Sequence, residues 1–173
     1  MLHNKIACFL ALVFAHIAFA AAGPTTKILT IHKEERFCIL LPPTSGTDVA
    51  DVADSLKKSV SYCTSPTAQV RHAKELPSGF LKTANYFEPA DLSYSQVTGT
   101  FDPAAFSLTT SDEGGMASPK LPSGASCLGF RYFIQFVEPN EGVYCIRCCH
   151  KKSDCPTNKA HKGCLAVIPG FYY

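Results

Sequence analysis

The sequence contains no tryptophan and only two methionines, and its charged residues make up 17% with a formal net charge of +2. So small a net charge gives no electrostatic basis for binding nucleic acid or an anionic membrane surface. The chain has no Asn-x-Ser/Thr acceptor for an N-linked glycan, and no G-x-S-x-G, H-E-x-x-H or glycine-rich phosphate-loop motif. These absences favour a non-enzymatic protein without a cofactor, and they predict no nucleic-acid partner.

Long apolar runs are also missing, except near the N-terminus, where residues 6–20 follow the positive charge of Lys5. The small residues Ala20, Ala21 and Ala22 come next, which completes the three-part pattern of a cleaved secretory signal. The run is shorter than the roughly 20 apolar residues of a membrane-spanning helix. We therefore predict a signal peptide over residues 1–22, a secreted extracellular protein and no membrane span.

Cysteine is abundant, with nine residues in the chain. Cys8 lies in the predicted signal, and the rest form an even set, which in a secreted chain predicts a disulfide framework: Cys38, Cys63, Cys127, Cys145, Cys148, Cys149, Cys155 and Cys164. The adjacent Cys148 and Cys149 are expected to bond to different neighbours, because a ring between them would strain the intervening peptide bond. Cys38 and Cys63 are candidates for pairing with each other, and the remaining pairs stay open.

A zinc site is the alternative interpretation of the C-terminal cysteines, because Cys145-x2-Cys148 is accompanied by His150 and His161. Structural zinc favours two close pairs of ligands, and the second half of this cluster does not supply a second tight pair. We therefore predict disulfides and no metal.

Hydrophobic patterning predicts a mainly β domain over residues 36–173, preceded by a flexible leader over residues 23–35. One helix is expected from Thr47 onward, because apolar residues recur there at helical spacing as far as Val60, with Cys63 continuing the same face. Strands are expected at residues 36–41, 79–87, 94–101, 130–137 and 143–148, the last two as a hairpin. The predicted fold is a disulfide-stapled β-sandwich or small β-barrel with one short α-helix.

Two groups of residues are candidates for a functional site. Asp112 and Glu113 precede two glycines, and such a cluster can hold a cation or perform acid and base chemistry; the alternative is an exposed turn. The second group combines aromatic rings with amides, as a sugar-binding surface requires: Tyr86, Tyr94, Gln96, Tyr132 and Gln135. Its alternative is a set of strand residues divided between core and surface.

Several blocks of the sequence resemble the spaced blocks of a fungal secreted family often labelled macrophage-activating-glycoprotein-like. The blocks are residues 37–43, 61–64, 76–86, 94–99, 112–115 and 136–149. The resemblance extends over nearly all of the chain that follows the predicted signal. It implies a secreted fungal protein of the extracellular space or cell wall that meets a host, and it implies no catalytic residues.

Three hypotheses about function follow. The first is a non-enzymatic secreted protein that acts at the fungal surface or on a host protein, as an effector or immune modulator. The second is a module that binds cell-wall polysaccharide, and the third is a small hydrolase that uses Asp112 or Glu113. We expect a monomer in each case.

Overall fold

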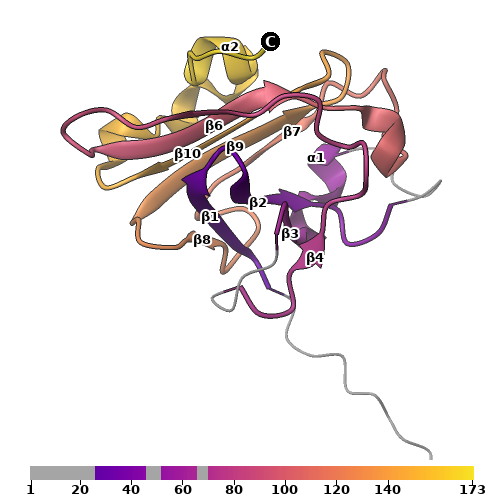
Figure 1. Ribbon diagram of the computed structural model, residues 1–173, viewed down its shortest axis with the longest axis horizontal. Coiled ribbons are helices and arrows are strands. Elements are labelled where there is room, and N and C mark those ends of the chain that lie inside the picture. Colours follow the sequence, from indigo (N-terminus) through magenta and orange to yellow (C-terminus); the bar gives the residue numbers. More distant parts are fainter. Residues whose placement is uncertain (1–25, 46–51, 66–69) are drawn as a thin grey trace, which may run out of the picture.

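The computed structural model describes residues 26–45, 52–65 and 70–173, and within them the chain is mainly β, as predicted. Two separate five-stranded sheets lie over one another as two layers (Figure 1), which is a sandwich rather than a barrel. The predicted signal peptide and the predicted helix start at residues 47–51 lie outside the described residues.

The first sheet has the strand order β4-β3-β2-β1-β8. Its strands are β1 (Ile28–Lys33), β2 (Arg36–Leu41), β3 (Val60–Cys63), β4 (Lys74–Glu75) and β8 (Ser126–Cys127). The second sheet has the order β5-β6-β10-β9-β7. Its strands are β5 (Asn85–Phe87), β6 (Tyr94–Thr100), β7 (Gly115–Ala117), β9 (Tyr132–Glu138) and β10 (Val143–Cys149).

Helical segments in the described part are short. They are the α-helices α1 (Val52–Ser55) and α2 (Gly163–Val167) and the 3₁₀ turns η1 (Leu56–Lys58), η2 (Pro103–Phe106), η3 (Lys152–Asp154) and η4 (Thr157–Lys162). Figure 1 shows α2 on the outer side of the second sheet, away from the first sheet. No helix in the described part is long and apolar enough to cross a membrane.

The predicted hairpin is confirmed, because β9 and β10 pair antiparallel from Glu138 opposite Val143 to Tyr132 opposite Cys149. Side chains alternate between the two faces of these strands. Phe133, Val137 and the β10 residues Tyr144 and Ile146 therefore belong to the core between the sheets, while their neighbours in sequence belong to a second core under α2.

The core between the sheets is continuous and aromatic. Phe37 of β2 stacks on Tyr144 of β10 with ring centroids 5.7 Å apart, and Phe80 packs against Phe101 at 4.9 Å. Each fully buried side chain of this size stabilises the fold by roughly 1.5–3 kcal/mol. The sheets are thus held together mainly by apolar area.

The predicted disulfide framework is also confirmed: the eight cysteines form Cys38–Cys63, Cys127–Cys148, Cys145–Cys164 and Cys149–Cys155. Cys38 and Cys63 are paired with each other, across β2 and β3. The adjacent Cys148 and Cys149 bond to different neighbours, as expected. Three of the four bridges start from β10, so this strand joins the first sheet and the C-terminal segment to the second sheet.

The expected helix is wrong in its second half. The helical region ends at Lys58, and Val60 and Cys63 lie in β3, where they pair with Leu41 and Cys38 of β2. Helical spacing of apolar residues predicted the wrong structure here because pairing with β2 overrides local preference.

Three other features of the secondary structure differ from the prediction. The leader is not flexible over residues 28–33, which form β1 with Leu29 and Ile31 buried. The strand expected at residues 79–87 is limited to β5. Helix α2 was not predicted, because five residues are too few to show a helical pattern.

Candidate functional site

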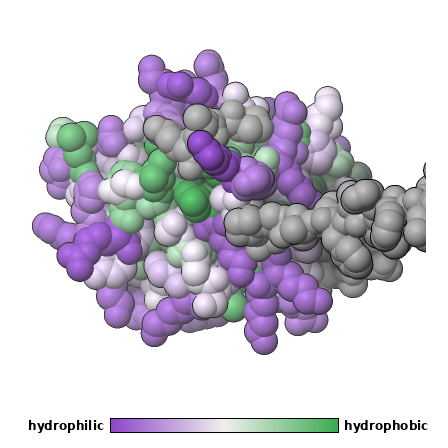
Figure 2. Space-filling model, turned by 90° about the horizontal axis from the view of Figure 1, so that it is seen from below, coloured by the Kyte–Doolittle hydropathy of each residue, from purple (hydrophilic) through white to green (hydrophobic). Residues whose placement is uncertain are grey.

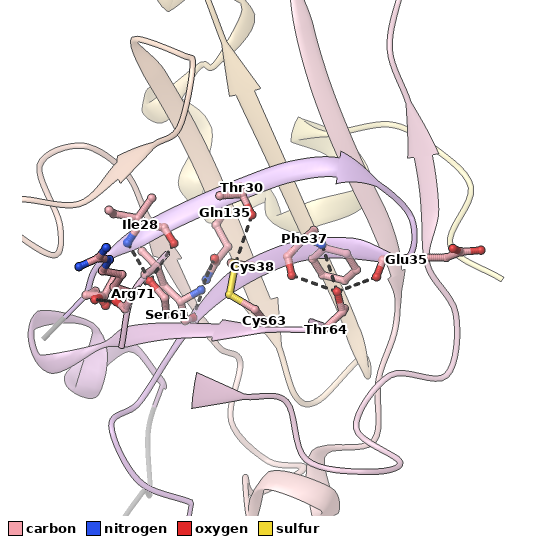
Figure 3. Close-up of a disulfide and its surroundings, with 12 residues drawn as sticks. Ile28, Thr30, Glu35, Phe37, Cys38, Ser61, Cys63, Thr64, Arg71 and Gln135 are labelled. Carbon is pink, nitrogen blue, oxygen red and sulfur yellow. Dashed lines mark hydrogen bonds between the residues drawn. A yellow bond between two sulfur atoms is a disulfide. The ribbon is translucent and has the colours of Figure 1, made fainter. Parts of the chain in front are cut away.

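Gln135 lies in the core between the sheets and is completely buried. Its Nε2 donates to the carbonyl of Leu40 at 2.7 Å, and its Oε1 accepts the N–H of Leu40 at 2.8 Å. Figure 3 shows this amide beside β2, near the Cys38–Cys63 disulfide. A side chain of the second sheet therefore hydrogen-bonds the backbone of the first, and Gln135 has no contact to offer a ligand.

Asp112 is also used inside the fold. Its Oδ2 accepts the N–H of Val52 at 2.7 Å, and its Oδ1 accepts the N–H of Gly114 at 2.7 Å. The side chain is 9% exposed. Both carboxylate oxygens are thus occupied in holding the start of α1 against the loop before β7, whereas Glu113 is exposed.

The three tyrosines of the predicted sugar-binding group are separated by the pleat of the second sheet. Tyr86 pairs with Val97 and packs against the core between the sheets. Tyr94 and Tyr132 lie on the outer face, where both pack against the core under α2. The pKa of Tyr86 is raised, chiefly by burial. These residues do not form one aromatic stripe.

Gln96 occupies the outer face of β6 and is 2% exposed. Its Oε1 accepts from Nε of Arg147 at 2.9 Å, and its Nε2 donates to the carbonyl of Pro169 at 3.0 Å. The Arg147 guanidinium also lies over the ring of Tyr94, 4.3 Å from the centroid. Burial lowers the pKa of Arg147. Gln96 is thereby fixed between a buried cation and the C-terminal segment.

The C-terminal segment runs along this outer face and is held by its carbonyl groups. The hydroxyl of Thr98 donates to the carbonyl of Phe171, and that of Thr83 donates to the carbonyl of Tyr172. The phenol of Tyr172 is buried and donates to the carbonyl of Ile168 at 2.7 Å. Phe171, one residue before Tyr172, is left 82% exposed.

A groove of about 280 Å³ lies between this segment and strands β5 and β6; we call it the aromatic groove. It is lined by Asn85, Tyr86, Phe87, Gln96, Thr98, Pro169, Gly170 and Phe171. Phe87 is half exposed, and its ring lies 6.1 Å from that of Tyr94. The groove therefore combines exposed aromatic rings with two amides, the chemistry expected for the second candidate group.

A second groove, of about 580 Å³, lies between the β7 edge and the start of α2; we call it the acidic groove. Its charged and titratable lining residues are Glu113, Glu138, Glu141, His161 and Lys162. The carboxylate of Glu138 accepts the N–H of Cys164 at 3.0 Å. Burial raises the pKa of Glu138; the hydrogen bond from Cys164 opposes this shift and the charge of Glu141 adds to it. Glu138 thus anchors α2.

Figure 2 shows the molecule from below the view of Figure 1, the side on which β4 and β8 lie. This side is mainly hydrophilic, and its largest hydrophobic area lies near its middle.

Gln96 and Tyr86 are both among the residues that line the aromatic groove, but the ring of Tyr86 packs against the core between the sheets on the other face of β5. Tyr94 lies beside the groove, against Phe87. Tyr132, Gln135 and Asp112 lie elsewhere. Sequence reasoning missed Asn85, Phe87 and Phe171. Strand alternation could have predicted that Asn85 and Phe87 lie on one face and Tyr86 on the other, because residues two apart share a face of a strand. No pattern near Phe171 in the sequence predicts that it lies beside them.

Comparisons with known proteins identify no relative of this chain, since no family model, curated protein or solved structure matches it.

Proposed function

We propose that this protein is a secreted, non-enzymatic fungal protein that acts at the cell surface by binding cell-wall polysaccharide. The observation that carries the proposal is the aromatic groove, where Phe87 and Phe171 are exposed beside Asn85 and Gln96. Ligand sites are typically concave and mostly apolar, with a few polar groups that set orientation. Sugar rings have apolar faces for aromatic rings and hydroxyl edges for amides.

The four disulfides support an extracellular location, since such bridges persist in oxidising compartments. Fungal origin and contact with a host rest on the family resemblance alone. A host protein is the alternative partner, as for an effector or immune modulator. The groove favours polysaccharide, because its volume of about 280 Å³ lies near the lower end of ligand pockets and accepts a unit about the size of one sugar.

Hydrolysis is less well supported. Both oxygens of Asp112 accept backbone N–H groups, so this carboxylate is committed to the fold. Glu113 lines the acidic groove, but Glu138, the half-buried carboxylate there, is bonded to Cys164. The groove with the most suitable chemistry for binding contains no carboxylate among its lining residues.

The proposal is tested by co-sedimentation of the mature protein with insoluble chitin and β-glucan. The variant Phe87→Ala/Phe171→Ala removes both exposed rings, and Leu128→Ala removes an exposed apolar side chain that does not line the groove. Because burying one Phe side chain contributes up to roughly 1.5–3 kcal/mol, the double variant should bind about 100-fold more weakly. Leu128→Ala should bind as the wild type does.

All three proteins should melt at similar temperatures, because the substituted side chains are exposed. Absence of the wild-type protein from both pellets would contradict the proposal. So would equal sedimentation of the wild type and the double variant.

A further inference from the structure

We infer that the aromatic groove selects the acetamido group of an N-acetylated sugar, so that the polymer it binds is chitin rather than β-glucan. This inference rests on the proposed function and specifies its ligand. It follows from the orientations of Asn85 and Gln96, which the surrounding hydrogen bonds define.

Gln96 has one N–H donor that the described part of the fold does not use. Arg147 can only donate, so its bond at 2.9 Å identifies the accepting atom of Gln96 as Oε1. The other atom is therefore Nε2, and one of its two hydrogens goes to the carbonyl of Pro169. Its second N–H has no acceptor among the described residues, and Gln96, which is 2% exposed, is one of the residues that line the groove.

Asn85 presents the complementary acceptor. The carbonyl of Thr98 can only accept, so its contact at 3.4 Å identifies the donating atom of Asn85 as Nδ2. Oδ1 lies on the other side of the same amide and accepts no hydrogen bond from the described residues. Asn85 is partly exposed, so this oxygen is accessible to a ligand.

The two amides belong to neighbouring strands and lie on the same face of the second sheet. Asn85 pairs with Thr98 and Phe87 pairs with Gln96, which makes Asn85 and Gln96 diagonal neighbours across β5 and β6. The backbone positions of diagonal neighbours lie about 7–8 Å apart, so their side chains are within reach of one ligand group. One acetamido group has an N–H for an acceptor on one side and a carbonyl for a donor on the other.

The rest of the groove is suited to the methyl group. Phe87, Pro169 and Phe171 provide apolar walls around the two amides. A glucose unit would place hydroxyl groups against these walls, and burying a hydroxyl without a partner costs free energy. An acetamido group instead places its methyl there while its N–H meets Asn85 and its carbonyl meets Gln96.

The experiment is calorimetric titration of the wild-type protein with three soluble tetramers: N-acetylglucosamine, its deacetylated form and β-1,3-linked glucose. The acetylated tetramer should bind at least about tenfold more tightly than the other two, because two hydrogen bonds and the methyl contact are lost without it. This comparison needs no variant and so does not depend on the folding of one.

Asn85→Leu should weaken binding of the acetylated tetramer about two- to tenfold, and it should weaken binding of the glucose tetramer by a smaller factor. The matched control is Asn158→Leu, since Asn158 lies in η4 and does not line the groove. Equal affinity for the acetylated and glucose tetramers, abolished by Phe87→Ala/Phe171→Ala, would overturn the acetamido inference and leave the proposed function standing.

Tighter binding of the deacetylated tetramer would also overturn the inference, because it would indicate recognition of an ammonium group. If no tetramer binds and the protein is absent from both insoluble polymers, the proposed function itself fails.

Discussion

The two faces of the second sheet are covered in different ways. Its inner face packs against another sheet through large apolar side chains. Its outer face is covered by residues 152–173, which contain only short helical turns. This segment is attached by Cys145–Cys164 and Cys149–Cys155 and by hydrogen bonds from Gln96, Thr98 and Thr83 to its carbonyls. The two extended sheets hold together mainly by buried apolar area, with one disulfide, Cys127–Cys148, between them. The irregular segment buries a smaller apolar cluster and is attached by two disulfides and several hydrogen bonds.

A buried glutamine illustrates the same contrast on each face. Gln135 joins the two sheets through the backbone of Leu40, inside the main core. Gln96 joins the second sheet to the C-terminal segment through Pro169. The hydrogen bonds of Gln135 stabilise the contact between the two sheets. The hydrogen bond from Gln96 to Pro169 stabilises only the C-terminal segment, which forms one wall of the aromatic groove. Three predictions test whether this difference in support is real.

The largest effect should come from the disulfides. Two double variants each remove one bridge: Cys145→Ser/Cys164→Ser and Cys38→Ser/Cys63→Ser. The paired cysteines are 19 and 25 residues apart in sequence, so the two bridges close loops of similar length. Each double variant should therefore lower the free energy of unfolding by about 3 kcal/mol. Only the first pair should also release the C-terminal segment. In that variant, amide hydrogen exchange in residues 152–173 should accelerate more than exchange in β9 and β10 does. If exchange in residues 152–173 accelerates no more than in β9 and β10, the comparison is contradicted.

The next largest effect should come from Gln135→Leu, which leaves the buried N–H and carbonyl of Leu40 without a partner. The free energy of unfolding, measured with urea, should fall by about 2 kcal/mol. Thr98→Val is the control on the outer face, because it removes one hydrogen bond to the C-terminal segment, at the carbonyl of Phe171, and leaves no buried charge without a partner. It should lower global stability less and raise proteolytic sensitivity of the C-terminal segment more. If the two variants behave alike, the two faces are not supported differently.

The smallest effect concerns pH and the acidic groove. Because burial raises the pKa of Glu138 above its usual 4.5, the folded protein binds this proton more tightly than the unfolded chain does. Stability contributed by Glu138 should therefore be highest below pH 4.5 and fall as pH rises through the raised pKa. Glu138→Gln keeps an acceptor for Cys164 and should melt slightly higher than the wild type at pH 7 but not at pH 4.

Glu75→Gln, which removes an exposed carboxylate on β4, is the control for the change of charge. Thermal melts across this pH range provide the measurement. A Glu138→Gln protein that loses more stability at pH 7 than at pH 4 would contradict this prediction, because it would show that the ionised carboxylate stabilises α2.

Three features could be predicted from the sequence, because each corresponds to a pattern or a count that needs no knowledge of the fold: the β-rich class, the β9–β10 hairpin and the disulfide framework. Alternation and a Pro-Asn-Glu-Gly turn mark the hairpin, and an even cysteine count marks the bridges. The helix was overextended because Val60 and Cys63 fit helical spacing as well as they fit β3. Pairing with β2 decides between these structures, and its partners lie about twenty residues away in sequence.

The candidate site was predictable only in part. Tyr86, Tyr94 and Gln96 were identified from their chemistry, but the same reasoning included Gln135, which faces the opposite side of the second sheet. Asp112 resembled a functional acid because its partner Val52 is 60 residues away. Phe171 could not be placed, since the hydrogen bonds from Thr98 and Thr83 that position its segment connect distant parts of the chain.

The sequence by itself determined that this chain is a β domain stapled by disulfides, because strand alternation and cysteine count are properties of neighbouring or countable residues. Only the tertiary structure decided which cysteines pair, Cys38 with Cys63 included, which face each polar strand residue occupies, and where the aromatic groove lies. Those outcomes depend on strand register and on the path of the C-terminal segment. Both are set by contacts between residues far apart in sequence, which no local pattern records.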